Sequence, residues 1–244
     1  MKLFLQALVI VPTALSALLV DFNAARGDDP SVLGLRNLEA ARDDKRSDNA
    51  ADLYIKAEKD ANGTAAAHFH RDKGNIRAEY HALNKKTQAD KTYWIGYDFA
   101  VPKIQKSLMI WQFKEFVANN ANDNGANIPL ALEFIDSKHL QFQYQASGTD
   151  KRVGQWQKNI IPNRRYKIGI AINTGAPGWV ELYVDGKQQG LGEGAVKRLT
   201  ANTFPGRADP KFGAYRGEEI EMDTFVYDVQ IGESKADVAR AAGF

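Results

Sequence analysis

Titratable side chains fall at alternate positions of the segment Asn75–Leu83, which has the pattern of a β-strand. Arg77, Glu79 and His81 would then share one face of a sheet, because successive residues of a strand point to opposite sides. A guanidinium, a carboxylate and an imidazole side by side can neutralise an anion and move a proton. The alternative is an ordinary solvated outer face.

Two other segments favour the reactive interpretation. Gln112 and Lys114 share one face of a predicted strand over residues 107–116, which is apolar on both sides and should therefore be central. Lys211 and Tyr215 share a face with two glycines, which we interpret as the floor of a groove. An amide, two cations and a phenol would then line a concave sheet that could hold a ligand.

Amide side chains extend this surface. Gln143 lies between two further glutamines on the polar face of the segment 140–145. The hydroxyl and carboxylate groups of a sugar polymer need many neutral and cationic donors, which these side chains would supply. We therefore predict that the partner is an acidic polysaccharide.

The elements that must position these residues are strands. Eleven segments of strand length, separated by Gly, Asn, Asp and Pro, follow one another after Ala51. They are 53–58, 65–70, 75–83, 92–101, 107–116, 130–135, 140–145, 166–173, 179–185, 211–216 and 224–231. Only residues 234–242 have a helical pattern, with a serine at its start. The pattern predicts an all-β fold, a two-sheet sandwich or jelly roll.

The first 50 residues differ in character from the rest. Residues 1–20 contain one lysine and a long apolar run with small residues near its end, which predicts a signal peptide and hence a secreted, extracellular protein. The competing interpretation is a membrane anchor. Residues 21–50 lack a period-2 pattern, so we expect a partly irregular leader there. We assign the domain to residues 51–244 and expect no membrane contact after removal of the signal peptide.

Composition excludes some classes of function and sets the source of stability. The 244 residues carry a formal net charge of +2, too small to indicate nucleic-acid binding. The chain has no cysteine, so no disulfide can stabilise the domain, and a large core must do so. We expect one domain and a monomer.

The three reactive segments resemble those of the alginate-lyase-like superfamily of jelly-roll polysaccharide lyases, marked by R-x-E, Q-x-H and Y-F-K-A-G-x-Y strands. The matching segments here are Arg77-Ala78-Glu79, Gln112-Phe113-Lys114 and Asp209-Pro210-Lys211-Phe212-Gly213-Ala214-Tyr215. Segments 93–99 and 178–186 are more similar to the heparin-lyase-I-like and glucuronan-lyase branches. Lys114 replaces the histidine of alginate lyases, which favours the glucuronan lyases of polysaccharide lyase family 20. The resemblance implies a concanavalin-like jelly roll with a substrate cleft on the concave sheet.

The resemblance also implies a reaction, the β-elimination of a 4-linked polyuronic acid. Gln112, supported by Arg77, would hydrogen-bond the uronate carboxylate and stabilise the enolate-like charge. Tyr215 would take the C5 proton and return it to the departing O4, with nearby cations favouring the phenolate. His81 is a second candidate base. The reaction needs no cofactor.

Four further side chains complete the predicted substrate site. They are Lys114, Lys211, Gln143 and Glu79.

Two metal sites are conceivable. By analogy with related jelly rolls, Asp223 is a candidate ligand for a structural calcium ion, although a turn-capping role is equally open. His68 and His70 fall on one strand face at a spacing compatible with zinc, but no third ligand is identifiable from the sequence.

Three other functions remain open. The nearest is an alginate lyase acting on polymannuronate. A glycoside hydrolase would need two carboxylates facing the cleft, for which Glu219, Glu221 and Asp223 alternate on one face. A non-catalytic carbohydrate-binding module would use the same sandwich, and the segment 179–186 resembles strands of such modules.

Overall fold

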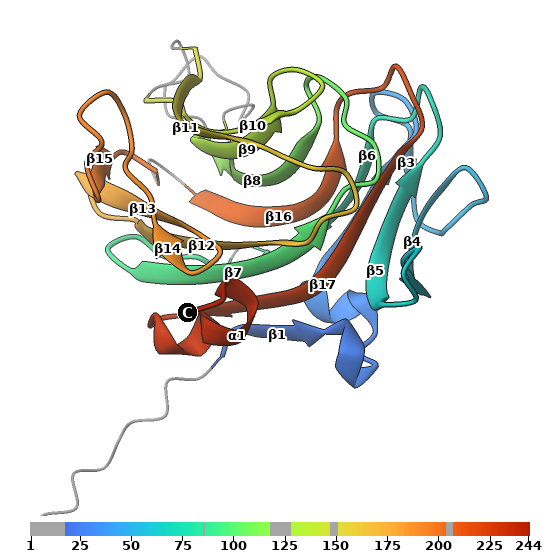
Figure 1. Cartoon of the computed structure of the whole chain (residues 1–244), viewed down its shortest axis with the longest axis horizontal. Helices are drawn as coiled ribbons and strands as arrows, with labels where there is room; N and C mark the ends of the chain where they lie inside the picture. Colours follow the sequence, from blue (N-terminus) through green and yellow to red (C-terminus); the bar gives the residue numbers. More distant parts are fainter. Residues whose placement is uncertain (1–17, 85, 118–127, 147–150, 204–206) are drawn as a thin grey trace, which may run out of the picture.

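Most strands of the first sheet were predicted from alternation. The computed structural model describes residues 18–84, 86–117, 128–146, 151–203 and 207–244. The strands of this sheet are β1 (Val20–Asn23), β4 (Leu53–Lys59), β5 (Ala65–Arg71), β7 (Thr92–Ala100), β12 (Tyr166–Asn173), β13 (Gly178–Val184), β14 (Lys187–Gln188), β15 (Leu199–Ala201) and β17 (Met222–Gly232). Their order is β14-β13-β12-β7-β17-β5-β4, with β1 paired to β17 and β15 paired to β13 (Figure 1).

The second sheet has eight strands and carries the segments with reactive side chains. They are β2 (Leu35–Glu39), β3 (Lys45–Arg46), β6 (Arg77–His81), β8 (Met109–Val117), β9 (Leu130–Phe134), β10 (His139–Tyr144), β11 (Val153–Asn159) and β16 (Arg207–Tyr215). Their order is β11-β10-β9-β8-β16-β6-β2-β3, and β16 pairs antiparallel with both β6 and β8. Two antiparallel sheets with almost no helix confirm the predicted jelly-roll sandwich.

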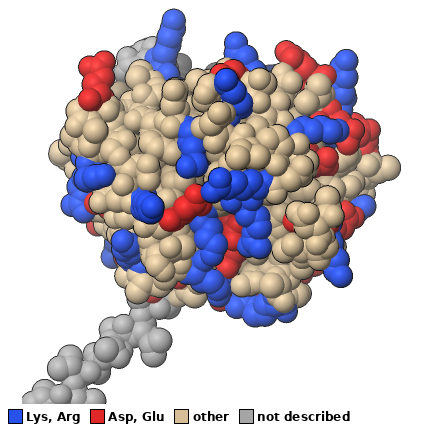
Figure 2. Space-filling view, viewed as in Figure 1, with Lys and Arg blue, Asp and Glu red and all other residues tan. Residues whose placement is uncertain are grey.

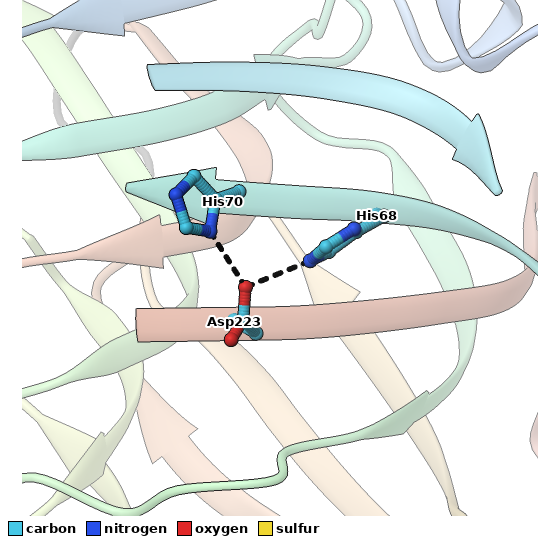
Figure 3. A group of neighbouring side chains, drawn as sticks. All are labelled: His68, His70 and Asp223. Carbon is cyan, nitrogen blue, oxygen red and sulfur yellow. Dashed lines mark hydrogen bonds and ion pairs between the residues drawn. The ribbon is translucent and has the colours of Figure 1, made fainter. Parts of the chain in front are cut away.

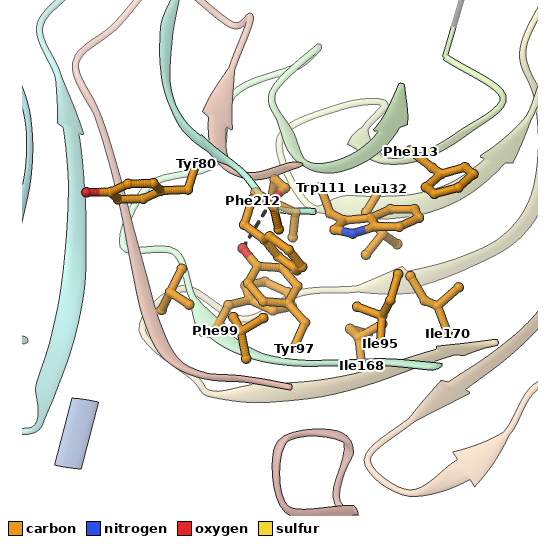
Figure 4. Packing of buried hydrophobic residues seen from close by; sticks show 14 of the residues in the cluster. Tyr80, Ile95, Tyr97, Phe99, Trp111, Phe113, Leu132, Ile168, Ile170 and Phe212 are labelled. Carbon is orange, nitrogen blue, oxygen red and sulfur yellow. Dashed lines mark hydrogen bonds between the residues drawn. The ribbon is translucent and has the colours of Figure 1, made fainter. Parts of the chain in front are cut away.

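Aromatic and branched side chains from the two sheets meet to form the core. Tyr97 of β7 contacts Phe212 of β16 with ring centroids 5.1 Å apart, and its hydroxyl donates a 3.1 Å hydrogen bond to the carbonyl of Ile110 (Figure 4). Trp111 and Phe113 of β8 are fully buried in the same cluster. Burial of one face of each sheet leaves the opposite face of β6, β8 and β16 for the polar residues.

The segment that we expected to be an irregular leader belongs to the sandwich. Val20 pairs with Ile231 through β1 and β17, and Leu38 of β2 pairs with Ala78 of β6. Phe22 between these strands is fully buried. Two short 3-10 helices, η1 (Ala24–Arg26) and η2 (Pro30–Leu33), connect β1 to β2. The sandwich therefore begins at Val20, and the predicted boundary at residue 51 is wrong. Residues 1–17 of the predicted signal peptide lie outside the described residues.

The predicted C-terminal helix over residues 234–242 is divided into η3 (Ala236–Val238) and α1 (Ala239–Ala242). The N-cap of η3 is Lys235, without a side-chain capping bond, and the Asp237 carboxylate within the helix accepts from the backbone amides of Glu233 and Ser234 before it. The helix packs on the outer face of the nine-stranded sheet beside Gly96, where a Cβ atom would lie 2.8 Å from that of Ala241. None of the helices in the described ranges is long and apolar enough to cross a membrane.

Candidate active site

A cleft lies over the outer face of the eight-stranded sheet, the face turned away from the core. Its larger part has a volume of about 770 Å³ and is lined by Arg77, Lys114 and Tyr215, among others. A neighbouring cavity of about 450 Å³ is lined by His81 and Lys211 and shares Arg77 and Lys114 with the larger one. The two cavities therefore form one continuous groove across β6, β8 and β16. Charges of both signs are interspersed over the face of the molecule seen in Figure 2.

Strand register brings the predicted residues together. Tyr215 of β16 lies opposite Arg77 of β6, and Lys211 lies opposite both His81 of β6 and Gln112 of β8. Because all these positions share one face of adjacent strands, their side chains lie on the cleft side of the sheet. The face assignments made from alternation therefore agree with the structure here.

A β-bulge changes one of these assignments. Strict alternation along β8 would place Met109 on the same face as Trp111, but the pairing of β8 with β9 shifts between these two residues. A bulge adds a residue to one strand and turns the side chains beyond it to the other face. Met109 consequently lines the cleft with Ile128 and packs against Tyr215, whereas Trp111 stays in the core.

The tyrosine at the end of β16 lies between two guanidinium groups. The ring centroid of Tyr215 is 4.4 Å from Cζ of Arg77 and 5.1 Å from Cζ of Arg216. The pKa of Arg216 is raised: burial acts to lower it, but the interactions with the Tyr215 phenol and the Glu218 carboxylate outweigh the effect of burial. Both arginines are therefore cations held against an aromatic face that lines the cleft.

Arg216 itself was missed by the sequence reasoning. Strict alternation would turn Arg216 away from Tyr215, but its backbone adopts the left-handed conformation, with φ of 65°. This local twist lets two consecutive side chains line the same cleft. The matched motif ends at Tyr215, one residue before Arg216, so it could not indicate a role for Arg216.

A buried polar layer lies beneath the cleft. Gln112 is fully buried, and its amide donates a 2.6 Å hydrogen bond to Oε1 of Glu79. Nε of Arg77 lies 3.3 Å from Oε2 of Glu39 and 3.4 Å from Oε2 of Glu79. These contacts are ion pairs, but their geometry is not that of a hydrogen bond. Within the described ranges, Arg77 Nε, Glu79 Oε2 and Gln112 Oε1 have no hydrogen-bond partner. Unpaired buried polar atoms cost about 1–3 kcal/mol each, so this layer favours a polar ligand or ordered water above it.

The predicted donor Gln112 therefore acts from below the surface. Its amide nitrogen is taken by Glu79, and Gln112 lines neither part of the groove. The side chains at the surface are Arg77, Lys114 and Arg216. Direct contact with a ligand anion falls first to these cations.

The lysine of β16 is almost completely buried. Desolvation lowers the pKa of Lys211 to about 8, although the neighbouring Glu79 acts to raise it. Lys114 is half-buried and lines both parts of the groove. The groove thus has one lysine that loses its proton readily and one at the surface.

The histidine of β6 has a buried carboxylate partner. Nε2 of His81 is 3.1 Å from Oδ2 of Asp209, and Asp209 also accepts a 2.6 Å hydrogen bond from the hydroxyl of Thr87. An acceptor at Nε2 favours the proton on that nitrogen and fixes the ring. His81 lines the smaller cavity and not the part that holds Tyr215.

Gln143 of β10 contributes to the cleft indirectly, by positioning an arginine. Oε1 of Gln143 accepts a 3.0 Å hydrogen bond from Nε of Arg152, whose guanidinium also lies 3.0 Å from Oε2 of Glu133. Arg152 lines the cleft, and Gln143 positions it. Sequence reasoning missed Arg152 because it lies just before β11, an exposed edge strand without an alternating pattern.

The glycine between Lys211 and Tyr215 does not provide groove space. A Cβ atom at Gly213 would lie 2.3 Å from the carbonyl oxygen of Ala78 and 2.7 Å from the ring of Phe69 in the core. Its φ of +135° and the register shift between Phe212 and Tyr215 show that the residue serves a bulge. Our interpretation of this glycine as groove floor is wrong.

Asp223 is on β17 of the other sheet, outside the cleft. Its Oδ1 lies 2.7 Å from Nε2 of His68 and 2.8 Å from Nδ1 of His70 (Figure 3). Calcium takes six to eight oxygen ligands, and imidazole nitrogens do not suit it. The donors around Asp223 therefore do not fit the calcium ion that we expected there.

The three carboxylates considered for a glycoside hydrolase do not form a pair in the groove. Glu219 accepts from Gln105, Glu221 pairs with Lys103, and none of the three predicted carboxylates lines the groove. The glutamates that do line it each pair with an arginine. These pairs are Glu39 with Arg77, Glu133 with Arg152 and Glu218 with Arg216.

Solved structures share this fold, whereas no protein-family model and no curated protein matches the sequence. An endo-β-1,4-glucuronan lyase from the fungus Trichoderma reesei superposes with a TM-score of 0.55 at 14% identity, over 84% of this chain and 97% of that one. The alginate lyase A1-II', of polysaccharide lyase family 7, gives 0.58 at 14% identity, over 85% and 99%. The globular domain of T. cruzi calreticulin gives 0.57 at 8% identity, over 92% and 91%. At these identities the likeness establishes the fold, and the site must decide the function.

Proposed function

We propose that the chain is a polysaccharide lyase that cleaves a 4-linked polyuronic acid, with glucuronan as the preferred polymer. The observation that carries the proposal is the placement of Tyr215 between Arg77 and Arg216 in the cleft. A phenol beside two guanidinium groups can move a proton while cations neutralise a neighbouring carboxylate. Both activities are required for β-elimination next to a uronate.

The reaction begins with binding of the uronate carboxylate at the arginines. Arg77 and Arg216 withdraw charge from the carboxylate, which makes the C5 hydrogen more acidic and stabilises the enolate-like transition state. Gln112 lies one layer below and fixes Glu79, which in turn lies beside Arg77. We therefore assign Gln112 a positioning role, in place of the direct contact first predicted.

The phenolate oxygen of Tyr215 then takes the C5 proton and becomes a phenol. The electron pair of the C5–H bond forms the C4–C5 double bond, the C4–O4 bond breaks, and Tyr215 returns the proton to O4. One residue can act in both steps because the C5 hydrogen and O4 lie on the same side of 4-linked glucuronate and mannuronate. The products are a new reducing end and a 4,5-unsaturated uronate end.

The choice of glucuronan over alginate rests on Lys114. This residue is at the position where alginate lyases have histidine, so the tyrosine must suffice as base. The fold does not distinguish the two polymers, because a glucuronan lyase and alginate lyases both share it. Lys114 and Lys211 line the groove and would bind neighbouring sugars, whereas Glu79 is buried below it and would position Arg77. A secreted monomer with a cleavable signal peptide remains part of the proposal.

A substrate panel tests the proposal. Glucuronan, polymannuronate, polyguluronate and heparin are incubated with the full chain, and ultraviolet absorbance of the new double bond is followed. We expect the fastest rise with glucuronan. Shortening of the polymer without absorbance would indicate a hydrolase, and binding without shortening would indicate a non-catalytic module.

A further inference from the structure

Two histidines and an aspartate form a compact group on the outer face of the nine-stranded sheet. His68 and His70 are alternate residues of β5, and Asp223 lies opposite His70 on β17. One ligand atom from each residue lies within 4.8 Å of the other two. His68 and His70 are each 9% exposed, and 16% of the Asp223 side chain is exposed. The group is therefore nearly buried but can be reached from solvent.

Each imidazole has a carboxylate at both of its nitrogens. Nδ1 of His68 lies 2.7 Å from Oε2 of Glu58, and Nε2 of His70 lies 3.1 Å from Oδ1 of Asp72. The opposite nitrogens point at Asp223, as Figure 3 shows. A neutral imidazole has one N–H, so it can donate to carboxylates on both sides only as the imidazolium.

A metal ion between the three residues would take the place of the second proton on each ring. The outer nitrogen of each ring would donate its proton to Glu58 or Asp72, and the inner lone pair would bind the ion. Carboxylates that hold the outer nitrogen of metal-binding histidines are a regular feature of such sites, because they fix the tautomer and raise the basicity of the ligand. This arrangement supplies the third ligand that the sequence left unidentified.

The ring orientations are also fixed by packing. His70 is stacked on Tyr54 with centroids 4.6 Å apart, and His68 is stacked on Phe225 at 4.5 Å. Tetrahedral ligands at about 2.0–2.1 Å from a zinc ion lie roughly 3.3 Å apart. Oδ1 of Asp223, now 2.7 Å and 2.8 Å from the two nitrogens, needs to separate from each by only about half an ångström to accept such an ion.

We propose that His68, His70 and Asp223 bind a divalent transition-metal ion, with Zn²⁺ as the best match, and that this ion fastens β5 to β17. Two imidazoles and one carboxylate are ligands that suit zinc, while calcium and magnesium prefer oxygen alone. The fourth position faces the exposed side of the group and would hold water. The site lies on the sheet opposite the cleft and takes no part in the proposed elimination.

Zinc titration of the chelator-treated full chain tests the proposal, followed by calorimetry and by the melting temperature. At a free Zn²⁺ concentration about 100 times Kd, we expect the melting temperature to rise by about 5–10 °C. His68→Gln, His70→Gln and Asp223→Asn should each abolish the rise. Glu58→Gln should keep it but weaken binding about 10–100-fold.

Two controls make the result specific. His139→Gln removes another histidine whose ring nitrogen lies 2.6 Å from a carboxylate, that of Asp136 on the other sheet, and should leave zinc binding unchanged. Ca²⁺ at the same concentrations should leave the melting temperature unchanged. If the histidine variants do not fold, the visible spectrum of Co²⁺ bound to the wild-type chain replaces them, with strong tetrahedral bands expected. The proposal is overturned if wild type and variants bind zinc alike, if calcium stabilises as much as zinc, or if cobalt gives no such bands.

Discussion

The hydroxyl of Tyr215 carries most of the proposed chemistry, and Tyr215→Phe removes that hydroxyl alone. The contacts of the ring with Arg77 at 4.4 Å and Arg216 at 5.1 Å involve its face, which phenylalanine retains. Packing against Met109 and Ile128 is retained as well. Substrate affinity and folding should therefore change little, by no more than about 1 kcal/mol for a hydrogen bond at the lost oxygen.

Turnover should respond very differently. General acid–base catalysis by a positioned side chain contributes about 10²–10⁴-fold, which corresponds to roughly 3–5 kcal/mol of activation free energy. Tyr215→Phe should therefore lower kcat by at least about 100-fold on glucuronan while KM changes less than about 5-fold. Initial rates from ultraviolet absorbance over a range of polymer concentrations give both constants.

A matched control separates this effect from the general loss of a hydroxyl. Tyr144 of β10 is on the same sheet, and its hydroxyl accepts a 2.8 Å hydrogen bond from the backbone of Asn202. Tyr144→Phe should leave kcat almost unchanged. The reasoning is refuted if Tyr215→Phe retains kcat within about 10-fold of wild type. It is also refuted if His81→Gln alone abolishes turnover with Tyr215 intact, since His81 would then be the base.

Three further predictions concern the stability of the frame around the cleft. Burial lowers the pKa of Lys211 to about 8 from 10.5, so the cost of its buried charge is greatest below about pH 8 and declines as pH rises toward 10.5. In urea unfolding, the free energy of unfolding of wild type should rise by about 1 kcal/mol relative to that of Lys211→Met between about pH 7 and pH 9. Parallel plots of this free energy against pH for the two proteins would contradict the prediction. Arg71 is fully buried and donates hydrogen bonds to the carbonyls of Asn75, Arg216 and Gly217. Arg71→Met should therefore lower the free energy of unfolding by about 3–5 kcal/mol. A loss under about 1 kcal/mol would be inconsistent with these bonds. Gly213→Ala forces a Cβ atom against the neighbouring strand and should cost roughly 2 kcal/mol or more by thermal unfolding, whereas an unchanged melting temperature would show that the bulge can relax.

Alternation of apolar and polar residues was sufficient to predict the long strands. Strand β12 has the predicted bounds, Tyr166–Asn173, because every second residue enters the core. The missed strands are short or lie at edges. The strand β1 has four residues directly after the apolar run, and β11, Val153–Asn159, has no buried residue. The alternation of β1 is too short to be distinguished from the apolar run before it. Strand β11 is held by backbone pairing with β10 and has no hydrophobic period in its sequence.

The same rule predicted which residues meet in the cleft, and it failed where the backbone departs from a regular strand. Arg77 and Tyr215 were placed correctly because register follows from alternation on paired strands. Met109 was misplaced by a bulge, and Arg216 was missed because of its left-handed backbone. Gln112 is fully buried, hydrogen-bonded to Glu79 and opposite Lys211 of the neighbouring strand, and the pattern of a single strand cannot reveal such neighbours.

One strand links the two proposed sites. On β5, His70 faces outward to Asp223, and the next residue, Arg71, faces inward to the carbonyls of Arg216 and Gly217 beside the cleft. An ion that fixed β5 against β17 would thus also restrain the backbone that carries Arg216. Its removal should lower the melting temperature first. Turnover at a temperature well below melting should persist, because Arg71 keeps its three carbonyl partners without any contribution from the metal ligands.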